Sequence, residues 1–493
     1  MSLVKEEEAG PPPVLKIIPV KREIPRRETA ESMAAKQKDI SVSEFFAKNR
    51  HLLGFDNPRK ALLTTVKEAV DNSLDACEEA GILACVTIVI EDLQPDRPAT
   101  AKQSRYRVTV IDNGPGIVRR QVENVFGRLL FGSKFHRLKM SRGQQGIGIS
   151  AAGMYGLITT GKPLVIHTRP SAKKPAHHVE LAMNTKTNRA EVTVDEETED
   201  FPPQRCKTLN AGTHDPGFLN PEDYITGTSV SIELEGRYQK GRASVDEFLE
   251  LTAIANPHAR IMFVPPTRVS ADEQDEQLLL KPAAVPGDVV DDSTTPVAPN
   301  GVDPAITTVE KDGVILFPRG TDQLPPETRE IQPHPKGIEL GTLLQMLKDY
   351  EAFNKTGTLY NFLQEKFCRI SAQRAGEFCD AIGVHSRTKC SDIDPPLAEK
   401  LFKEFQEAKV PPPPTDCLAP IGVRQLLAGM LKGVKAEFYA ASSREPDVYR
   451  GRPFQIEAAI AFGGELPADD TARVIRFANR VPLLFQQSAC SSF

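Results

Sequence analysis

Carboxylate and amide side chains are concentrated in residues 67–77, with a spacing that suits a helix. At about 100° per residue, four of them would share about a quarter of its circumference: Glu68, Asp71, Asn72 and Asp75. The opposite side would carry Leu62, Val66, Val70, Ser73 and Cys77. The polar face is either an ordinary solvated surface or an oxygen-rich surface turned towards a polar ligand. Because Asn and Asp are unfavourable in the middle of a helix, their presence favours the ligand.

Two glycine-rich segments follow that helix and suit a phosphate-bearing ligand. Residues 105–111 alternate as a half-buried strand does and lead into the turn Asp112-Asn113-Gly114-Pro115-Gly116-Ile117. Residues 143–148 read Gly-Gln-Gln-Gly-Ile-Gly and precede a run, 149–155, that is compatible with a helix. Backbone amides and a helix N-terminus in such a loop can bind phosphates. Either segment alone could be an ordinary turn, but their order and spacing together indicate a nucleotide site.

Four motifs in this order resemble the GHKL (Bergerat-fold) ATPases, a group that includes type II topoisomerases, heat-shock chaperones, MutL-type repair proteins and histidine kinases. They are Glu-x-x-Asp-Asn-x-x-Asp-Ala at 68–76, Asp-x-Gly-x-Gly at 112–116, Gly-x-x-Gly-x-Gly at 143–148 and Gly-Thr at 227–228. The sequence has no Gly-x-x-x-x-Gly-Lys-Ser/Thr loop, which excludes a P-loop NTPase. Segments 255–260, 333–341, 413–418, 449–457 and 477–484 resemble the topoisomerase VI B subunits more specifically. This resemblance extends over about residues 41–490, apart from an insertion near 268–330.

The resemblance implies a role for individual residues. Glu68 would be the catalytic base for the attacking water, Asn72 would hold Mg²⁺, and Asp112 would accept the adenine amino group. The remaining residues expected to bind ATP are Gly114, Gly116, Ile117, Ser133, Lys134, Gly143, Gln144, Gln145, Gly146, Ile147, Gly148 and Thr228. Lys134 is either a phosphate contact or a solvated surface residue. Asp71 and Asp75 are expected to serve as helix caps or supporting salt links.

The implied fold is α+β, and composition shifts divide the chain. Residues 1–40 are expected to be a flexible arm, 41–267 the GHKL ATPase α/β sandwich, and 268–335 a linker with an insertion. A helix-two-turn-helix domain is expected at 336–412, and an α/β transducer domain, C-terminally incomplete, at 413–493. In the transducer, alternation predicts one strand facing a core: Phe454, Ile456, Ala458, Ile460 and Phe462.

The resemblance also implies function and partners. The chain would be the ATP-hydrolysing subunit of a type IIB DNA topoisomerase, an enzyme in which ATP-driven self-dimerisation gates the passage of double-stranded DNA. A separate A subunit would cleave the DNA in an A2B2 heterotetramer. We expect a cytoplasmic, nucleoid-associated protein with no membrane partner. With a net charge of −5, DNA contacts must come from local patches, and one candidate for DNA or triphosphate is Lys134, His136, Arg137, Lys139 and Arg142. The eight scattered cysteines indicate free thiols.

One departure from the family concerns a lysine. The family's transducer continues to a Trp-Lys-x-Tyr motif whose lysine reaches the γ-phosphate, but this sequence contains no tryptophan and ends at Phe493. We therefore expect a fragment, a frameshifted product or a divergent form, with weak hydrolysis, a frayed C-terminal domain and poor pairing with the A subunit. Two alternatives stay open: a nucleotide-dependent dimerising clamp without turnover, and another GHKL ATPase of the chaperone or MutL type.

Overall fold

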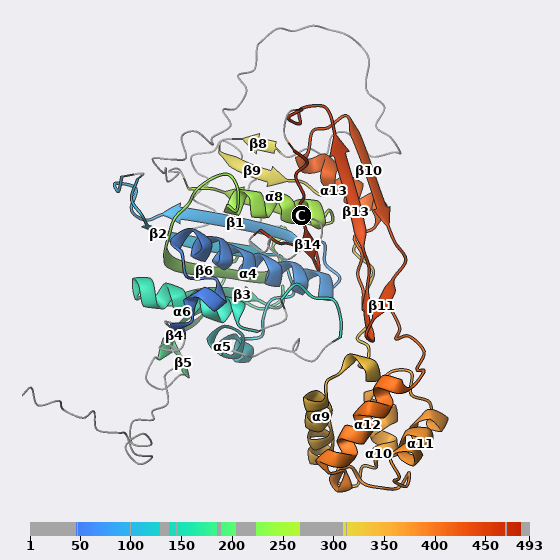
Figure 1. Ribbon diagram of the computed structural model, residues 1–493. Helices are drawn as coiled ribbons and strands as arrows, with labels where there is room; N and C mark the ends of the chain where they lie inside the picture. Colours follow the sequence, from blue (N-terminus) through green and yellow to red (C-terminus); the bar gives the residue numbers. More distant parts are fainter. Residues whose placement is uncertain are drawn as a thin grey trace, which may run out of the picture. The chain divides into compact units, whose positions relative to one another are not determined.

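A nine-stranded mixed sheet, built from strands between residues 85 and 317, forms the centre of the first part of the described chain (Figure 1). The structure is a computed structural model that describes residues 46–484 except 47, 99, 129–137, 144–145, 185–188, 204–222, 267–308, 312 and 469–470. The strand order is β5-β4-β3-β6-β2-β1-β7-β9-β8. All neighbours are antiparallel except β1 and β7, which are parallel.

The strands of this sheet are β1 (Cys85–Asp92), β2 (Ser104–Asp112), β3 (Leu164–Arg169), β4 (Ala176–Asn184), β5 (Arg189–Thr198), β6 (Gly227–Gly236), β7 (Arg260–Val264), β8 (Val309–Lys311) and β9 (Val314–Phe317). The helices that the structure describes in the same part of the chain are α3 (Arg50–Leu53), α4 (Pro58–Glu79), α5 (Arg119–Gly127), α6 (Gly148–Thr160) and α8 (Val245–Ala255). The strand predicted at 105–111 and the helix predicted after Gly148 are confirmed as β2 and α6.

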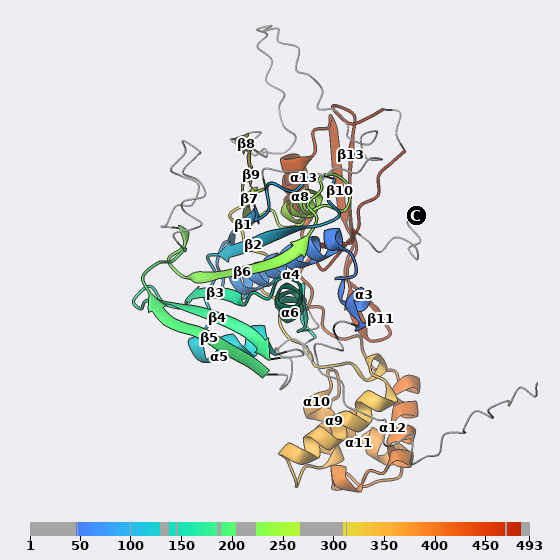
Figure 2. The same ribbon diagram turned by 90° about the vertical axis from the view of Figure 1, so that its left-hand side faces the viewer.

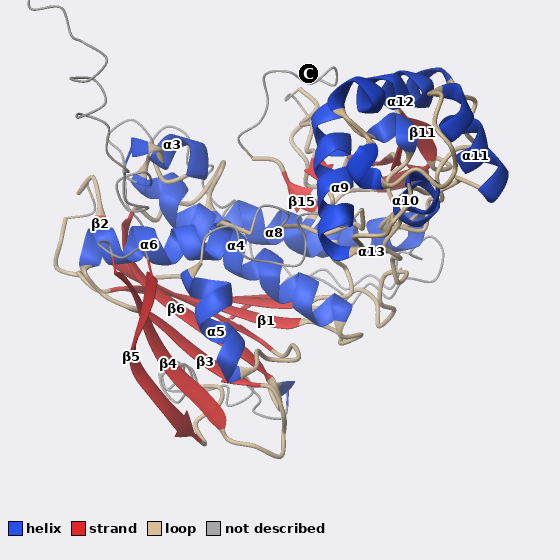
Figure 3. Cartoon of the chain, turned by 90° about the horizontal axis from the view of Figure 1, so that it is seen from below, coloured by secondary structure: helices blue, strands red, loops and turns tan. Residues whose placement is uncertain are grey.

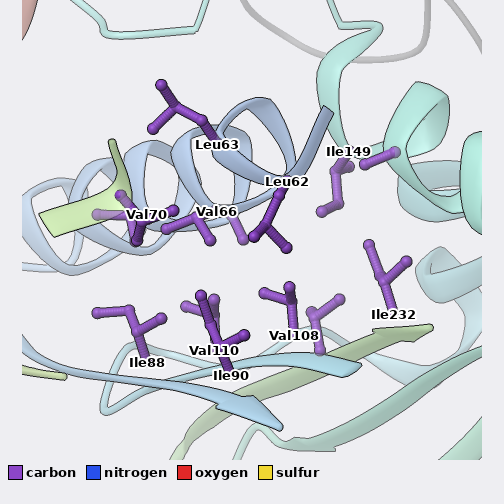
Figure 4. Close-up of a cluster of buried hydrophobic side chains, with 14 of the residues drawn as sticks. Leu62, Leu63, Val66, Val70, Ile88, Ile90, Val108, Val110, Ile149 and Ile232 are labelled. Carbon is purple, nitrogen blue, oxygen red and sulfur yellow. The ribbon is translucent and has the colours of Figure 1, made fainter. Parts of the chain in front are cut away.

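Helices α4, α5, α6 and α8 cover one face of the sheet (Figure 3). Figure 2 shows α4 and α6 lying along β6. The apolar side of α4 points into the sheet, where Leu62, Val66 and Val70 meet side chains of β1, β2 and β6 (Figure 4). Because the apolar side of α4 packs on the sheet, its polar side faces away from the sheet, as the spacing in 67–77 predicts.

Helix α4 begins at a strong capping sequence. The side chain of Asn57 accepts hydrogen bonds from the backbone nitrogens of Arg59 (2.8 Å) and Lys60 (3.5 Å), and Pro58 takes the first helical position. The helix then runs for 22 residues.

Part of the segment predicted to be a linker belongs to the sheet. Strand β9 pairs with β7, and β8 pairs with β9, so the sheet extends beyond the ATPase boundary expected at residue 267. The physical reason is that β7 would otherwise leave an open edge, which the apolar strand Val314–Phe317 closes.

A separate cluster of helices follows. It comprises η3 (Pro335–Gly337), α9 (Leu340–Phe353), α10 (Leu359–Lys366), α11 (Ala372–Ala381), η4 (Cys390–Asp392) and α12 (Pro395–Glu407). Its core includes edge-on aromatic contacts from Phe367 to Phe362 (5.7 Å between ring centroids) and to Phe405 (5.2 Å). Thr358, Ser371 and Asp394 cap α10, α11 and α12 with their side chains. The segment is therefore helical, and its assignment as a helix-two-turn-helix domain at 336–412 stays a prediction.

The last segment contains α13 (Val423–Gly433), β10 (Phe438–Ser443), β11 (Asp447–Tyr449), β12 (Arg452–Phe454), β13 (Glu457–Phe462), β14 (Phe477–Ala478) and β15 (Val481–Pro482). Helix α13 packs on α8 so closely that a Cβ at Gly429 would overlap the carbonyl oxygen of Ile254.

The prediction of one strand from Phe454 to Phe462 facing a core is wrong. Phe454 ends β12, Ile456 lies between the two strands, and the other three residues belong to β13. Ile456, Ile460 and Phe462 are 56%, 59% and 71% exposed. In the described residues, strand β13 pairs only with β10. Helix α13 packs against one face of these two strands, at Tyr439 and Ala461, and Ile460 and Phe462 lie on the other face. No helix in the described part of the chain is long and apolar enough to cross a membrane.

Candidate functional site

A cavity of about 1310 Å³ lies against the polar side of α4. Ten of the predicted site residues line it: Glu68, Asn72, Asp112, Gly116, Ile117, Gly143, Gly146, Ile147, Gly148 and Thr228. Gly114 lies just behind it and donates its backbone N–H to Asp112. Four further predicted residues, Ser133, Lys134, Gln144 and Gln145, lie outside the described residues. Motifs that are up to 160 positions apart in sequence therefore meet around one space.

At one end of the cavity, the Glu68 carboxylate lies over the first residue of α6. A Cβ at Gly148 would overlap this carboxylate, so only glycine allows the approach. Lys67 Nζ is 3.3 Å from Glu68 Oε1 and 3.0 Å from Asp71 Oδ2. The N-terminus of a 13-residue helix carries partial positive charge, so this end can accept an anionic group beside a carboxylate.

Asn72 follows Glu68 by one turn of α4 and is exposed to the cavity. Its side-chain oxygen lies 3.8 Å from the ideal Cβ position of Gly143, at the start of the glycine-rich loop. An amide oxygen in this position can bind a hard cation. No cluster of three or more His, Cys, Asp or Glu side chains suited to a metal occurs in the described residues.

At the other end, Asp112 is buried and accepts three hydrogen bonds. Its Oδ1 accepts from the backbone nitrogens of Gly114 (2.9 Å) and Thr228 (3.2 Å), and its Oδ2 accepts from Ser73 Oγ (2.9 Å). Burial raises the pKa of Asp112 to about 6, an effect that these three donors partly offset. Because each carboxylate oxygen can accept two hydrogen bonds, Oδ2 can take one more donor from a ligand.

The floor around Asp112 depends on close backbone approaches. A Cβ at Gly116, where φ is +68°, would lie 2.6 Å from the carbonyl oxygen of Arg169. A Cβ at Gly227, where φ is +147°, would overlap the carbonyl oxygen of Asp112. Thr168 Oγ1 accepts the N–H of Ile117 (2.7 Å) and lies 3.4 Å from Thr228 Oγ1. The Asp-x-Gly-x-Gly turn and the Gly-Thr pair therefore form one unit.

Replacing Gly227 by alanine should destabilise the protein by about 3 kcal/mol, because the new Cβ meets a backbone oxygen in a conformation that disfavours L side chains. The measurement is urea unfolding. Gly161→Ala is the matched control: φ is +72° there, but nothing lies within 4 Å of the new Cβ, so backbone strain of about 1 kcal/mol is expected. Equal losses in the two variants would contradict the close packing under Asp112.

The comparisons with known proteins agree with this geometry. Residues 57–198 match the family model described as histidine kinase-, DNA gyrase B-, and HSP90-like ATPase, and residues 413–493 match the topoisomerase VI B subunit transducer. The B subunit of type 2 DNA topoisomerase 6 from Methanosarcina acetivorans is 41% identical over 462 residues, which are 94% of this chain and 62% of that protein. The chain is similar to the topoisomerase VI B subunits over 94% of its length.

Further members of the family match over similar regions. The B subunit of Archaeoglobus fulgidus is 37% identical over 93% of this chain and 63% of its own length. The B subunit of Halobacterium salinarum is 29% identical over 94% of this chain and 71% of its own length. The chain thus spans under two thirds of the length of the more similar relatives.

Behind the site, a buried ion-pair network ties α4 to the glycine-rich loop. Arg142, whose side chain is fully buried, donates to Asp75 Oδ1 (2.7 Å) and to both oxygens of Glu78 (3.0 and 2.5 Å). It also donates to Asn256, and His258 Nε2 lies 2.7 Å from Glu78 Oε1. Asp75 thus forms the salt link expected of it. Arg142, in contrast, is not part of an exposed basic patch, because its side chain is buried and paired with two carboxylates.

The transducer segment joins the same network. Arg480 Nη1 lies 3.7 Å from Glu78 Oε1, and the Arg480 guanidinium also donates to the carbonyl oxygens of Ala419 and Pro420. Asn479 Nδ2 donates to the carbonyl oxygen of Ser141 (3.2 Å), one residue before Arg142. Residues 478–479 and 481–484 also line the cavity. One carboxylate, Glu78, therefore connects α4, the glycine-rich loop and the transducer.

Sequence reasoning missed several of these contributors. Ser73 falls on the apolar side of α4 in the helical pattern, yet it donates to Asp112. Thr168 lies within an alternating strand and carries no local signal. Asn256 and His258 occur in a segment that resembles the family, although no role follows from that segment alone. The partners of all four come from distant elements, which a local pattern does not identify.

Proposed function

We propose that this chain is the ATP-binding and ATP-hydrolysing subunit of a type II DNA topoisomerase. The observation that carries the proposal is the composition of one cavity. One end holds a buried carboxylate with a remaining acceptor position, and the other holds a carboxylate and an amide beside a helix N-terminus. These ends suit a neutral base with an amino group and a chain of phosphates, respectively.

In this proposal, Asp112 selects adenine because its Oδ2 can accept one more hydrogen bond, from the amino group of the base. Guanine offers a carbonyl oxygen at the same position and would leave two acceptors facing each other. The close approaches at Gly116 and Gly227 bring the backbone up to the base, and Ile117 and Thr228 complete that end of the cavity.

The phosphates would lie against the N-terminus of α6 and the loop Gly143, Gly146, Ile147 and Gly148, with Ser133, Lys134, Gln144 and Gln145 as further proposed contacts. Glu68 would orient the attacking water and accept its proton. Asn72 would hold Mg²⁺ through its amide oxygen, and this ion would supply positive charge to the phosphate oxygens. The position of Glu68 over Gly148 supports this assignment, because the water would lie beside the terminal phosphate.

Partners are proposed from the relatives' name. Because the relatives are B subunits, a separate A subunit is implied, and we propose an A2B2 assembly. In it, ATP binding closes a dimer of two B subunits around one DNA duplex while the A subunit cleaves another. Because its proposed substrate is chromosomal DNA, the protein would act in the cytoplasm, at the nucleoid. The chain itself would supply ATP turnover.

Asp112→Asn tests the adenine end. The amide NH₂ would face the ligand's amino group or the Ser73 hydroxyl, so ATP affinity should fall about 10- to 100-fold. Binding of ATP and GTP with Mg²⁺ is measured by calorimetry, with ATP turnover alongside. Equal affinity of the unaltered protein for ATP and GTP would contradict the adenine assignment. ATP-dependent dimerisation without turnover would favour the clamp alternative.

A further inference from the structure

Lys67 lies beside the proposed base and is held there by a buried neighbour. Its Nζ bridges Glu68 Oε1 (3.3 Å) and Asp71 Oδ2 (3.0 Å). The side chain of Asp71 is 3% exposed, whereas those of Lys67 and Glu68 are 32% and 24% exposed. A buried carboxylate needs a cation, because removal from water disfavours its charged form. Asp71 therefore restricts the ammonium group of Lys67 to a small volume.

The two oxygens of Glu68 have different surroundings. Oε1 is within ion-pair distance of Lys67, the one cation so close to Glu68 among the described residues. Oε2 is on the side of Gly148, at the start of α6, where a Cβ would overlap it. The carboxylate is thus held at one oxygen, while the other oxygen points to the place where the proposed function puts the water.

We propose that Lys67 is a positioning residue for the reaction: anchored by Asp71, it holds Glu68 Oε1 so that Oε2 faces the attacking water. The inference rests on the proposed role of Glu68. Lys67 contributes orientation and no proton transfer of its own. Displacement of a reacting group by about 1 Å can lower a rate about 100-fold. We therefore expect kcat to fall strongly when Glu68 is no longer held in one rotamer.

The test is steady-state ATP turnover by Lys67→Met, which keeps most of the length of the side chain and removes its charge. We expect kcat to fall about 10- to 100-fold while the Kd for a non-hydrolysable ATP analogue changes less than about 3-fold. Lys67→Arg should recover most of kcat, because a cation remains between the two carboxylates. Asp71→Asn, which removes the anchor, should lower kcat in the same way. Lys162→Met, at an exposed lysine beyond the end of α6, is the matched control and should behave as the unaltered protein.

A double-mutant cycle separates positioning from a structural role. In the Glu68→Gln background, Lys67→Met should have no further effect on turnover, because the group that it orients is already lost. A large additional loss there would overturn the inference. So would a 10-fold or greater rise in the Kd of the analogue with kcat unchanged, because that result would make Lys67 a phosphate ligand.

Crystal structures give a result that does not depend on turnover. In Lys67→Met the Glu68 carboxylate should leave its position over Gly148, and an unchanged carboxylate would overturn the inference. Absence of turnover in the unaltered protein would instead contradict the proposed function, and the displacement of Glu68 would still decide whether Lys67 positions it.

Discussion

Glu68→Gln should reduce ATP turnover at least 100-fold and leave ATP binding nearly unchanged. Glutamine has almost the same shape but cannot accept a proton from water, and general base catalysis contributes about 10² to 10⁴ in rate. The substituted side chain would still fit over Gly148, so the cavity should keep its form. The measurement is steady-state turnover with Mg²⁺, together with the Kd of ATP by calorimetry.

Glu79→Gln is the control for this prediction. Glu79 lies on the same helix, is exposed, and does not line the cavity. Its loss should leave turnover within about 2-fold, as expected for a surface substitution away from the site. If Glu68→Gln hydrolysed ATP as fast as the unaltered protein, another group would have to be the base.

Glu78→Ala should destabilise the protein by about 3–5 kcal/mol, because it leaves the buried Arg142 with only Asp75 as a carboxylate partner. His258 and Arg480 also lose their contacts with Glu78. Urea unfolding measures the change. Glu79→Ala, at the exposed neighbouring position, should alter the free energy of unfolding by less than about 0.5 kcal/mol.

The same carboxylate predicts a dependence of stability on pH. Burial alone would raise the pKa of Glu78, but Arg142 and His258 lower it well below its ordinary value. A carboxyl group whose pKa is lowered by folding stabilises the protein above its unfolded pKa of about 4.3, and the contribution is lost as pH falls towards the folded pKa. Stability should therefore decline below about pH 4.5, and this decline should be shallower in Glu78→Gln. Parallel pH profiles for the two proteins would contradict the assignment.

The sequence predicted the elements that carry strong local signals. The helical spacing of 67–77, the alternation before Asp112 and the glycine loop before α6 each specify a local structure, and all three are present. The family resemblance then supplied the order in which these elements meet. The polar face of α4 was only partly described by its spacing, however: Asn72 is exposed to the cavity, while Asp71 and Asp75 are buried in ion pairs.

What could not be predicted depends on contacts between distant segments. The alternation from Phe454 to Phe462 indicates a core, but a strand pattern does not reveal whether a second layer covers that face, and these residues are exposed. The basic run that ends at Arg142 suggests a surface patch, whereas the carboxylates that enclose Arg142 lie 64 and 67 positions earlier. Strands β8 and β9 complete the sheet only after a long segment has intervened.

The contact between Gly429 and Ile254 has a mechanical consequence. The residues on either side of Gly429 carry side chains, so sliding or rotating α13 along α8 would press Ala428 or Met430 against the Ile254 carbonyl group. The two helices are therefore expected to move together as one rigid unit. Because α13 also packs against β10 and β13, a displacement of α8 relative to the nine-stranded sheet would also displace the paired strands β10 and β13.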